Sequence, residues 1–182
     1  MAKKYIVLDT ETTGLEVKAG HRVIEIGAVL VNDRKKSEEH FHSYLNPERL
    51  IDEEATKVHG ISNQDLEDKP LFQEIAEEFL EFIQGSTLVI HNAEFDLAHL
   101  NNELSLLGKK KISNEIIDTL ILAREKFPGS SVSLDSLCKR YRVDNSKRAQ
   151  HTALIDCDLV AKAYINLIDQ KEPTLNVQNQ DQ

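Results

Sequence analysis

The first part of the chain alternates apolar runs with short polar turns, a pattern that predicts β-strands. The three runs lie at residues 5–8, 23–31 and 41–45. Successive strands joined by short turns pair with their neighbours, so these runs favour an antiparallel meander. The stretch after Pro47 has neither a strand period nor a helix period, and we expect irregular structure around Glu54 and His59.

The second part of the chain changes to a helical period. Apolar residues between Phe72 and Ile83 recur at helical spacing, and Gly85 stands where that helix would end. Two further short strands are expected at 88–90 and 116–117, and further helices after His91 and at 119–126, 134–141 and 152–168. Strands followed by alternating helices and strands predict one α/β domain, with a mixed sheet flanked by helices.

Two acidic residues end the first strand. Asp9 and Glu11 lie two residues apart, so on a strand their side chains share one face. Neighbouring carboxylates repel each other unless a proton or a cation lies between them. A hard divalent cation such as Mg²⁺ or Mn²⁺ suits these ligands and leaves room for phosphate oxygens. Taken alone, the pair fits a solvated acidic turn about as well.

Two more acids lie on helix faces that are otherwise apolar. Asp96 precedes leucines by four, eight and eleven residues, and Asp156 precedes apolar residues by four, seven and eleven. A carboxylate on the core-facing side of a helix needs a partner. The four acids therefore predict one cluster with two divalent cations, about 3.5–4 Å apart as in other phosphoryl-transfer sites. His151 precedes Asp156 on a lead-in loop, where it can act as a general base.

Length and composition describe an ordinary globular protein. The chain has 182 residues, of which 40% are hydrophobic and 29% charged. We expect one domain over residues 1–170 and a flexible polar tail over 171–182, which has too few apolar residues to order itself. The net charge of −9 disfavours broad binding to duplex DNA, yet it is compatible with an enzyme that binds one strand end through metal ions.

Other features bear on location and on the remaining reactive side chains. No stretch resembles a transmembrane span or a signal peptide, so we expect a cytoplasmic protein without membrane contact. Cys138 and Cys157 are far apart and are expected to be small buried hydrophobes. The remaining histidines considered are expected to be surface or capping residues: His21, His40, His42 and His99.

Three segments, in order along the chain, resemble the exonuclease motifs of the DnaQ-like, DEDDh superfamily. They are Asp9-Thr10-Glu11, the segment 91–96 with sequence HNAEFD, and the segment 151–156 with sequence HTALID. Shorter segments at 58–61, 127–129, 133–135 and 144–148 make the chain most similar to the proofreading epsilon subunits of bacterial DNA polymerase III. The resemblance covers residues 5–167.

This resemblance implies a ribonuclease-H-like fold and the removal of nucleotides from a DNA 3′ end by metal-activated water. Asp9, Glu11 and Asp156 would hold the metal that binds the attacking water. Asp9 would also bridge to a second metal near Asp96. His151 would deprotonate the water.

The resemblance and the neighbouring residues also suggest contacts to substrate. Glu54 and His59 match positions that touch the terminal nucleotide, and Thr12 and Gly14 follow the acids closely enough to join them. Gly14 fits a turn residue equally well. Asn92 is either a substrate contact or a helix cap, and we favour the cap. Phe95 fits a stacking contact with a base about as well as a core role. Lys147 and Arg148 are either phosphate ligands or a solvated basic loop.

The resemblance further implies partners. These are a single-stranded or frayed DNA 3′ end and the alpha and theta subunits of DNA polymerase III. Family members commonly continue into a polymerase-binding segment, whereas this chain stops at Gln182. Residues 170–175 are only faintly similar to a clamp-binding peptide, so strong binding to the sliding clamp is not expected.

Two other functions remain open from the sequence. An RNA-trimming 3′→5′ exonuclease would use the same chemistry on another polymer. A non-catalytic module that binds a polymerase would keep the acids for structure alone. All five presumed catalytic positions carry the required residue type, which favours the enzyme.

Overall fold

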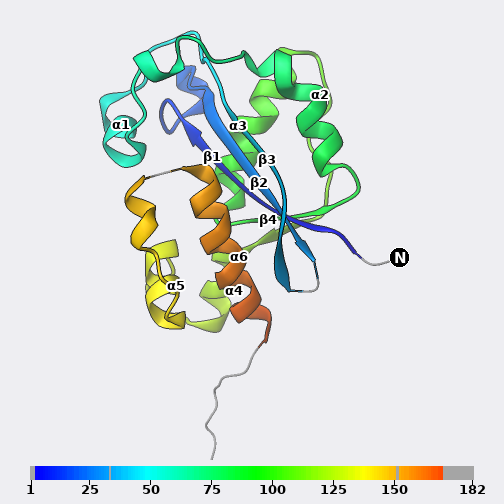
Figure 1. Ribbon diagram of the computed structural model, residues 1–182, viewed down its shortest axis with the longest axis vertical. Coiled ribbons are helices and arrows are strands. Elements are labelled where there is room, and N and C mark those ends of the chain that lie inside the picture. Colours follow the sequence, from blue (N-terminus) through cyan, green and yellow to red (C-terminus); the bar gives the residue numbers. More distant parts are fainter. Residues whose placement is uncertain (1–2, 33, 151, 170–182) are drawn as a thin grey trace, which may run out of the picture.

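A five-stranded mixed sheet organises the structure. The computed structural model describes residues 3–32, 34–150 and 152–169 (Figure 1). The strand order is β3-β2-β1-β4-β5. The strands are β1 (Tyr5–Thr12), β2 (Val23–Asn32), β3 (Lys35–Tyr44), β4 (Thr87–Ile90) and β5 (Ile116–Asp118). The β1–β2 and β2–β3 pairs are antiparallel, and the β1–β4 and β4–β5 pairs are parallel, which confirms the predicted meander within a mixed sheet.

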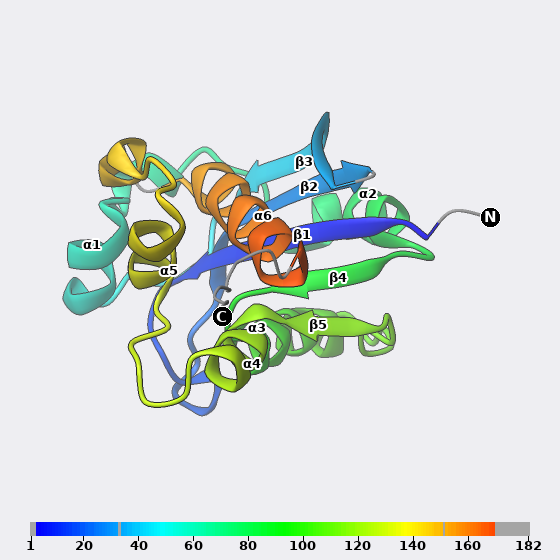
Figure 2. The same cartoon turned by 90° about the horizontal axis from the view of Figure 1, so that it is seen from below.

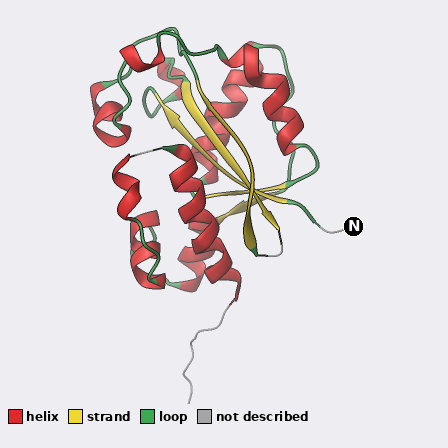
Figure 3. Cartoon of the chain, viewed as in Figure 1, coloured by secondary structure: helices red, strands yellow, loops and turns green. Residues whose placement is uncertain are grey.

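Helices cover both faces of this sheet (Figure 3). They are α1 (Glu53–His59), α2 (Phe72–Ile83), α3 (Ala93–Leu106), α4 (Thr119–Lys126), α5 (Leu134–Tyr141) and α6 (Ala153–Asp169). Helices α2 and α3 lie on one side, and α4, α5 and α6 lie together on the other (Figures 1 and 2). None of the helices that the structure describes is long and apolar enough to cross a bilayer.

Two elements differ from the sequence-based expectation. The segment expected to be irregular around Glu54 forms α1, a helix with two acids in its first turn and Gly60 in the left-handed conformation at its end. This helix buries only His59, so it leaves no apolar period to detect. Strand β3 begins at Lys35 rather than Phe41, because an edge strand tolerates charged residues on both faces.

The alternation of side chains along β1 places the polar residues at its end. Ile6 and Leu8 pack in the core formed with α2 and α3, whereas Val7 packs in the core formed with α6. Both faces are covered, which explains why the strand is continuously apolar. Continued past Leu8, the same alternation puts Asp9 on the α6 face and Thr10 on the α3 face.

The two cysteines are buried and free, as expected from their spacing. Cys157 Sγ lies 3.2 Å from the carbonyl oxygen of Gly27, and burial raises the pKa of its thiol well above the usual range. Cys138 is buried on α5. Both therefore serve as core residues.

Candidate active site

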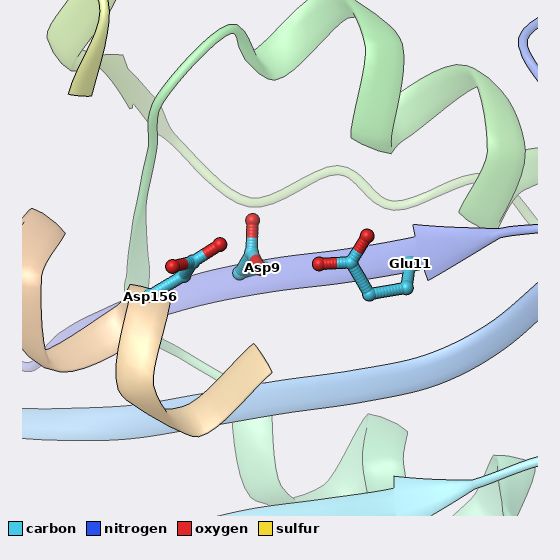
Figure 4. Close-up of side chains that lie close together, drawn as sticks. All are labelled: Asp9, Glu11 and Asp156. Carbon is cyan, nitrogen blue, oxygen red and sulfur yellow. The ribbon is translucent and has the colours of Figure 1, made fainter. Parts of the chain in front are cut away.

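Three carboxylates meet where β1 ends and α6 begins. Asp9, Glu11 and Asp156 each offer one oxygen, and these oxygens lie within 4.8 Å of one another. Figure 4 shows Asp9 and Glu11 side by side on β1, with Asp156 approaching from α6. The structure thus brings the two acids that lie two residues apart on the strand close to the acid on the core-facing side of the helix. A cavity of about 640 Å³ opens over the cluster.

Asp96 reaches the same cavity from the other face of the sheet. It lies in the first turn of α3, is buried, and accepts a hydrogen bond of 2.6 Å from Thr10 Oγ1. It is not one of the three acids that fall within 4.8 Å of one another in the described structure. The fourth predicted acid therefore lies beside the cluster. Thr10, which sequence reasoning did not single out, fixes its orientation.

Burial and mutual repulsion make these acids hard to ionise together. Burial raises the pKa of Asp9 well above its usual range, and the charges of Asp96, Glu11 and Asp156 raise it further. The same two causes raise the pKa of Glu11 to about 8, with burial first and Asp156 next. Burial also raises the pKa of Asp96 to about 7, although the Thr10 hydrogen bond opposes this shift.

The cluster fits a divalent cation. Asp9 Oδ2 is buried and has no hydrogen-bond partner among the described residues. A buried oxygen without a donor is costly unless a cation or water satisfies it. Hard cations such as Mg²⁺ and Mn²⁺ prefer carboxylate oxygens, so the three acids suit such an ion, with Asp96 available at the side.

Helix α6 approaches the sheet closely because residue 27 has no side chain. A Cβ placed on Gly27 would lie 2.8 Å from the backbone carbon of Ala153, at the first residue of α6. Glu25, two residues earlier on β2, accepts a 3.0 Å hydrogen bond from the backbone nitrogen of Ala153. Gly27 and Glu25 together set where α6 starts, and this determines where Asp156 lies.

Replacing Gly27 by alanine is expected to push the start of α6 outward and to separate Asp156 from Asp9. A misplacement of about 1 Å in an active site costs about 10²-fold in rate, so we expect a loss of about 10-fold to 100-fold. Mn²⁺ affinity should fall as well, as measured by titration calorimetry. Gly85→Ala is the matched control, because a Cβ there meets nothing within 4 Å and only backbone strain results. Unchanged kinetics in Gly27→Ala would contradict this role.

Glu25 was missed by the sequence analysis. It is fully buried and accepts a 2.6 Å hydrogen bond from His42 Nε2 as well as the bond from Ala153. It pairs directly across from Glu11 on the neighbouring strand. The sequence does carry a signal for it, because Glu25 is a lone acid inside the apolar run 23–31. A strand that is buried on both faces is otherwise apolar.

A second cavity of about 560 Å³ adjoins the cluster and holds most of the predicted substrate-contact residues. Its lining includes Thr12, Gly14, Glu54, His59 and Phe95, together with Glu11. His59 is buried, donates from Nε2 to the carbonyl oxygen of Thr12 at 3.1 Å, and so ties α1 to the end of β1. Glu54 is exposed at the rim, and its carboxylate pairs with Lys57. The lining of this cavity is more apolar than that of the carboxylate cavity.

Two side chains at the start of α3 clarify alternatives left open by the sequence. Asn92 stands at the start of the helix, but its side chain makes no capping hydrogen bond, so the predicted cap is wrong. Asp118 caps the helix instead, because it accepts from the backbone nitrogens of Asn92 and Ala93. Asn92 lines the carboxylate cavity, and Phe95 lines both cavities while its ring lies 4.5 Å from that of His99.

Two histidines expected at the surface are buried. His21 lies 2.8 Å from Thr13 Oγ1 and 3.2 Å from Asp52, and His99 donates to the carbonyl oxygen of Leu15 at 3.1 Å. They hold the turn after β1 from two sides, which explains their burial. His42 is half-buried against Glu25, so its predicted surface role is also wrong. The expectation of a surface residue holds for His40, which is exposed and has its Nδ1 2.9 Å from the Glu38 carbonyl oxygen.

The predicted general base, His151, lies outside the described residues. In the part of the chain that the structure describes, the histidine lining the carboxylate cavity is His91. Its Nδ1 lies 2.8 Å from Thr119 Oγ1, its Nε2 lies 3.0 Å from the Val132 carbonyl oxygen, and burial lowers its pKa. Both ring nitrogens are therefore engaged, which makes His91 a poor base and leaves that role to another residue.

Residues 6–164 match the family described as exonuclease (RNase_T). DNA polymerase III subunit epsilon of Rickettsia prowazekii is 51% identical over 178 residues, which are 96% of this chain and 78% of that protein. The subunit of the same name from Escherichia coli is 49% identical over 170 residues, or 89% of this chain and 70% of that protein.

Solved structures show the same fold. Exonuclease X in complex with 5′ overhanging duplex DNA has a TM-score of 0.73 at 27% identity, covering 93% of this chain and 94% of that chain. The nuclease domain of 3′hExo, a DEDDh family member bound to rAMP, has a TM-score of 0.76 at 19% identity, covering 92% of each chain. The second likeness bears on the fold alone.

Proposed function

The chain belongs to the exonuclease family, and from that premise we propose that it is a 3′→5′ DNA exonuclease that proofreads for a replicative DNA polymerase. The observation that carries this proposal is the meeting of Asp9, Glu11 and Asp156 at the end of β1, beneath an open cavity. The relatives named DNA polymerase III subunit epsilon, about half identical to this chain, support DNA as the substrate and proofreading as the role.

We propose that Asp9, Glu11 and Asp156 hold one divalent cation and that Asp9, with Asp96 beside it, holds another. When bound, two such cations activate water and neutralise the phosphate under attack. Mg²⁺ and Mn²⁺ both suit these oxygen ligands. The protein's own contribution is to keep the carboxylates in register, through the β1 backbone, the Thr10 hydrogen bond to Asp96 and the close approach of α6 at Gly27.

His151 is the proposed general base. It follows the turn that ends at Gln150 and precedes α6, the helix that carries Asp156. An imidazole takes a proton near neutral pH, which suits the removal of a proton from attacking water. The engaged nitrogens of His91 support assigning this role elsewhere.

The cavity between β1, α1 and α3 is the proposed site for the terminal nucleotide. Leu15, Val58 and Phe95 line it and offer apolar surface for a base or sugar. Thr12, Gly14, Glu54 and His59 complete the set of proposed contacts. Asn92 lies in the adjoining carboxylate cavity, where its amide can reach a phosphate.

The test is the release of mononucleotides from end-labelled single-stranded DNA in the presence of Mg²⁺ or Mn²⁺. We expect stepwise shortening from the 3′ end, and faster release from DNA than from RNA of the same sequence. A higher rate on RNA would favour the RNA-trimming alternative. No release from either polymer, together with no Mn²⁺ binding by calorimetry, would favour the non-catalytic module.

The raised pKa of Glu11 gives a prediction for stability without metal. Its pKa in the folded protein is about 8, against an ordinary value of 4.5, so between these values the folded state binds more protons than the unfolded state. Stability should therefore fall as pH rises through this window, and the melting temperature should be lower at about pH 8.5 than at about pH 6. Glu11→Gln should flatten this dependence. A melting temperature that rises over the same range would contradict the assignment.

The partners are proposed from the sequence resemblance, and the relatives named DNA polymerase III subunit epsilon support a polymerase as partner. A chain of this kind would act while bound to the polymerase alpha subunit and the theta subunit, in the cytoplasm where a bacterial chromosome is copied. The predicted tail at 171–182 and the segment 170–175, with its faint likeness to a clamp-binding peptide, lie outside the described residues. The expectation of no strong contact with the sliding clamp therefore stays a prediction from the sequence.

A further inference from the structure

Arg148 bridges one acid of the cluster and one acid outside it. It lies in a short 3₁₀ turn, η3 (Ser146–Gln150). Its Nε donates to Asp156 Oδ1 at 2.9 Å, and its Nη1 lies 2.8 Å from Asp135 Oδ1 at the start of α5. All three side chains line the carboxylate cavity. The guanidinium thus already contacts one of the oxygens available to a metal.

The two bonds differ in their surroundings. The Asp135 side chain is 62% exposed, whereas the Asp156 side chain is 10% exposed. An exposed ion pair is weak and easily exchanged, while a charge-assisted hydrogen bond to a buried carboxylate is stronger. Arg148, itself 29% exposed, is therefore held mainly by Asp156 and still reaches the open cavity.

A cation at this place has two opposite effects on the site. It offsets the repulsion among the carboxylates, and its charge lowers the pKa of Glu11 against the other influences. It also repels any divalent cation bound to the same carboxylates and engages Asp156 Oδ1. The second cation lining this cavity in the described structure, Lys57, is paired with Glu54 instead.

We propose that Arg148 is a built-in counter-cation that competes with divalent metal for Asp156 and moves onto a backbone phosphate of the bound strand. This inference rests on the proposed function, because it assumes that the cavity receives a nucleotide. A guanidinium pairs well with phosphate oxygens in a bidentate arrangement, so a phosphate is a suitable replacement for Asp156.

The exchange links metal binding to substrate binding. A phosphate that draws Arg148 away from Asp156 frees an oxygen for the metal, so each ligand should tighten the binding of the other by the same factor. The site would then bind metal weakly until a strand end arrives. Neither consequence follows if Arg148 only stabilises the turn before α6.

The test is titration calorimetry with Mn²⁺, with and without thymidine 5′-monophosphate, on the whole chain and on Arg148→Gln. Without nucleotide, the variant should bind Mn²⁺ about tenfold more tightly than the parent, because a repelling charge and a competitor for Asp156 are both gone. Adding nucleotide should tighten Mn²⁺ binding in the parent and do so much less in the variant. On DNA, the variant should show a raised KM.

Lys147→Gln is the matched control, because it removes the same charge one residue earlier from an exposed side chain. It should leave Mn²⁺ affinity nearly unchanged. Arg148→Lys keeps the charge but loses the paired donors of the guanidinium. Its Mn²⁺ affinity should lie between that of the parent and that of Arg148→Gln. If Arg148→Gln does not fold, this second variant decides the question by the same titration.

Equal or weaker Mn²⁺ affinity in a folded Arg148→Gln, or in Arg148→Lys where that variant decides, would overturn the proposal. A gain in Mn²⁺ affinity in Lys147→Gln as large as that in Arg148→Gln would also overturn it. Failure of the proposed function is recognised separately, as a parent chain that releases no nucleotide from DNA. In that case the metal-only titration still reports on the competition for Asp156.

Discussion

Replacing Asp9 by asparagine is expected to reduce nucleotide release from single-stranded DNA by about 10⁴-fold or more. Asp9 contributes to both proposed cation sites, and asparagine keeps its shape while losing its charge. The variant should be more stable than the parent without metal, since the pKa of Asp9 is raised by burial and by four neighbouring acids, and ionising it is therefore unfavourable. The measurements are single-turnover rates and melting temperature at about pH 8.

The matched control is Asp158→Asn. Asp158 lies on α6 two residues after Asp156, but its carboxylate pairs with Lys36 and Lys162 outside the cluster. Its replacement should leave the rate within about twofold of the parent, as is usual for partly exposed ion pairs. Equal activity in Asp9→Asn and the parent would remove the carboxylate cluster from the reaction.

Replacing His151 by alanine is expected to reduce the rate by about 10²-fold to 10⁴-fold while Mn²⁺ affinity is kept. A general base accelerates the transfer of a proton and holds no metal, so the two measurements should separate. The parent rate should rise with pH as an imidazole loses its proton, near pH 6.5 for an unperturbed histidine, and the variant should lose this dependence.

His40→Ala is the control for this second variant, since His40 is exposed on the edge strand β3 and its ring nitrogen lies beside a backbone carbonyl oxygen. It should show the parent rate and the parent pH profile. If His151→Ala instead loses Mn²⁺ binding in proportion to its rate, His151 is a ligand or a support for the cluster and another group takes the proton.

The predictable parts of the fold are those in which burial repeats along the sequence. Strand β1 is apolar on both faces because helices cover both, and α2 carries a helical period that the core requires. The missed parts lack such a period. Helix α1 buries one side chain, and the first half of β3 is a charged edge.

The residues in and around the candidate site also fall into a predictable group and a group that was missed. Asp9, Glu11 and Asp156 could be brought together from the sequence because each stands on a defined face of a strand or helix that leads into the core. The buried positions of His21 and His99 could not be predicted in this way, because their partners Asp52 and Leu15 lie far from them along the chain. Such contacts depend on how loops fold back, which no local period encodes.

Glu25 shows where sequence reasoning had a usable signal. A single acid within an apolar strand must find a donor, and here it finds His42 and the backbone of Ala153. The sequence indicates that a partner exists, but only the fold identifies it. The partner explains why α6 starts close enough to β1 for Asp156 to join the cluster.

The central claim is that the carboxylates at the end of β1 and the start of α6 hold the catalytic metals. Crystals grown with Mn²⁺ and thymidine 5′-monophosphate, measured for anomalous scattering from manganese, test it most directly. We expect two peaks about 3.5–4 Å apart, with an oxygen of Asp9 contacting both and the nucleotide phosphate beside them. Manganese only at other surface acids, with water alone between Asp9, Glu11 and Asp156, would contradict the account.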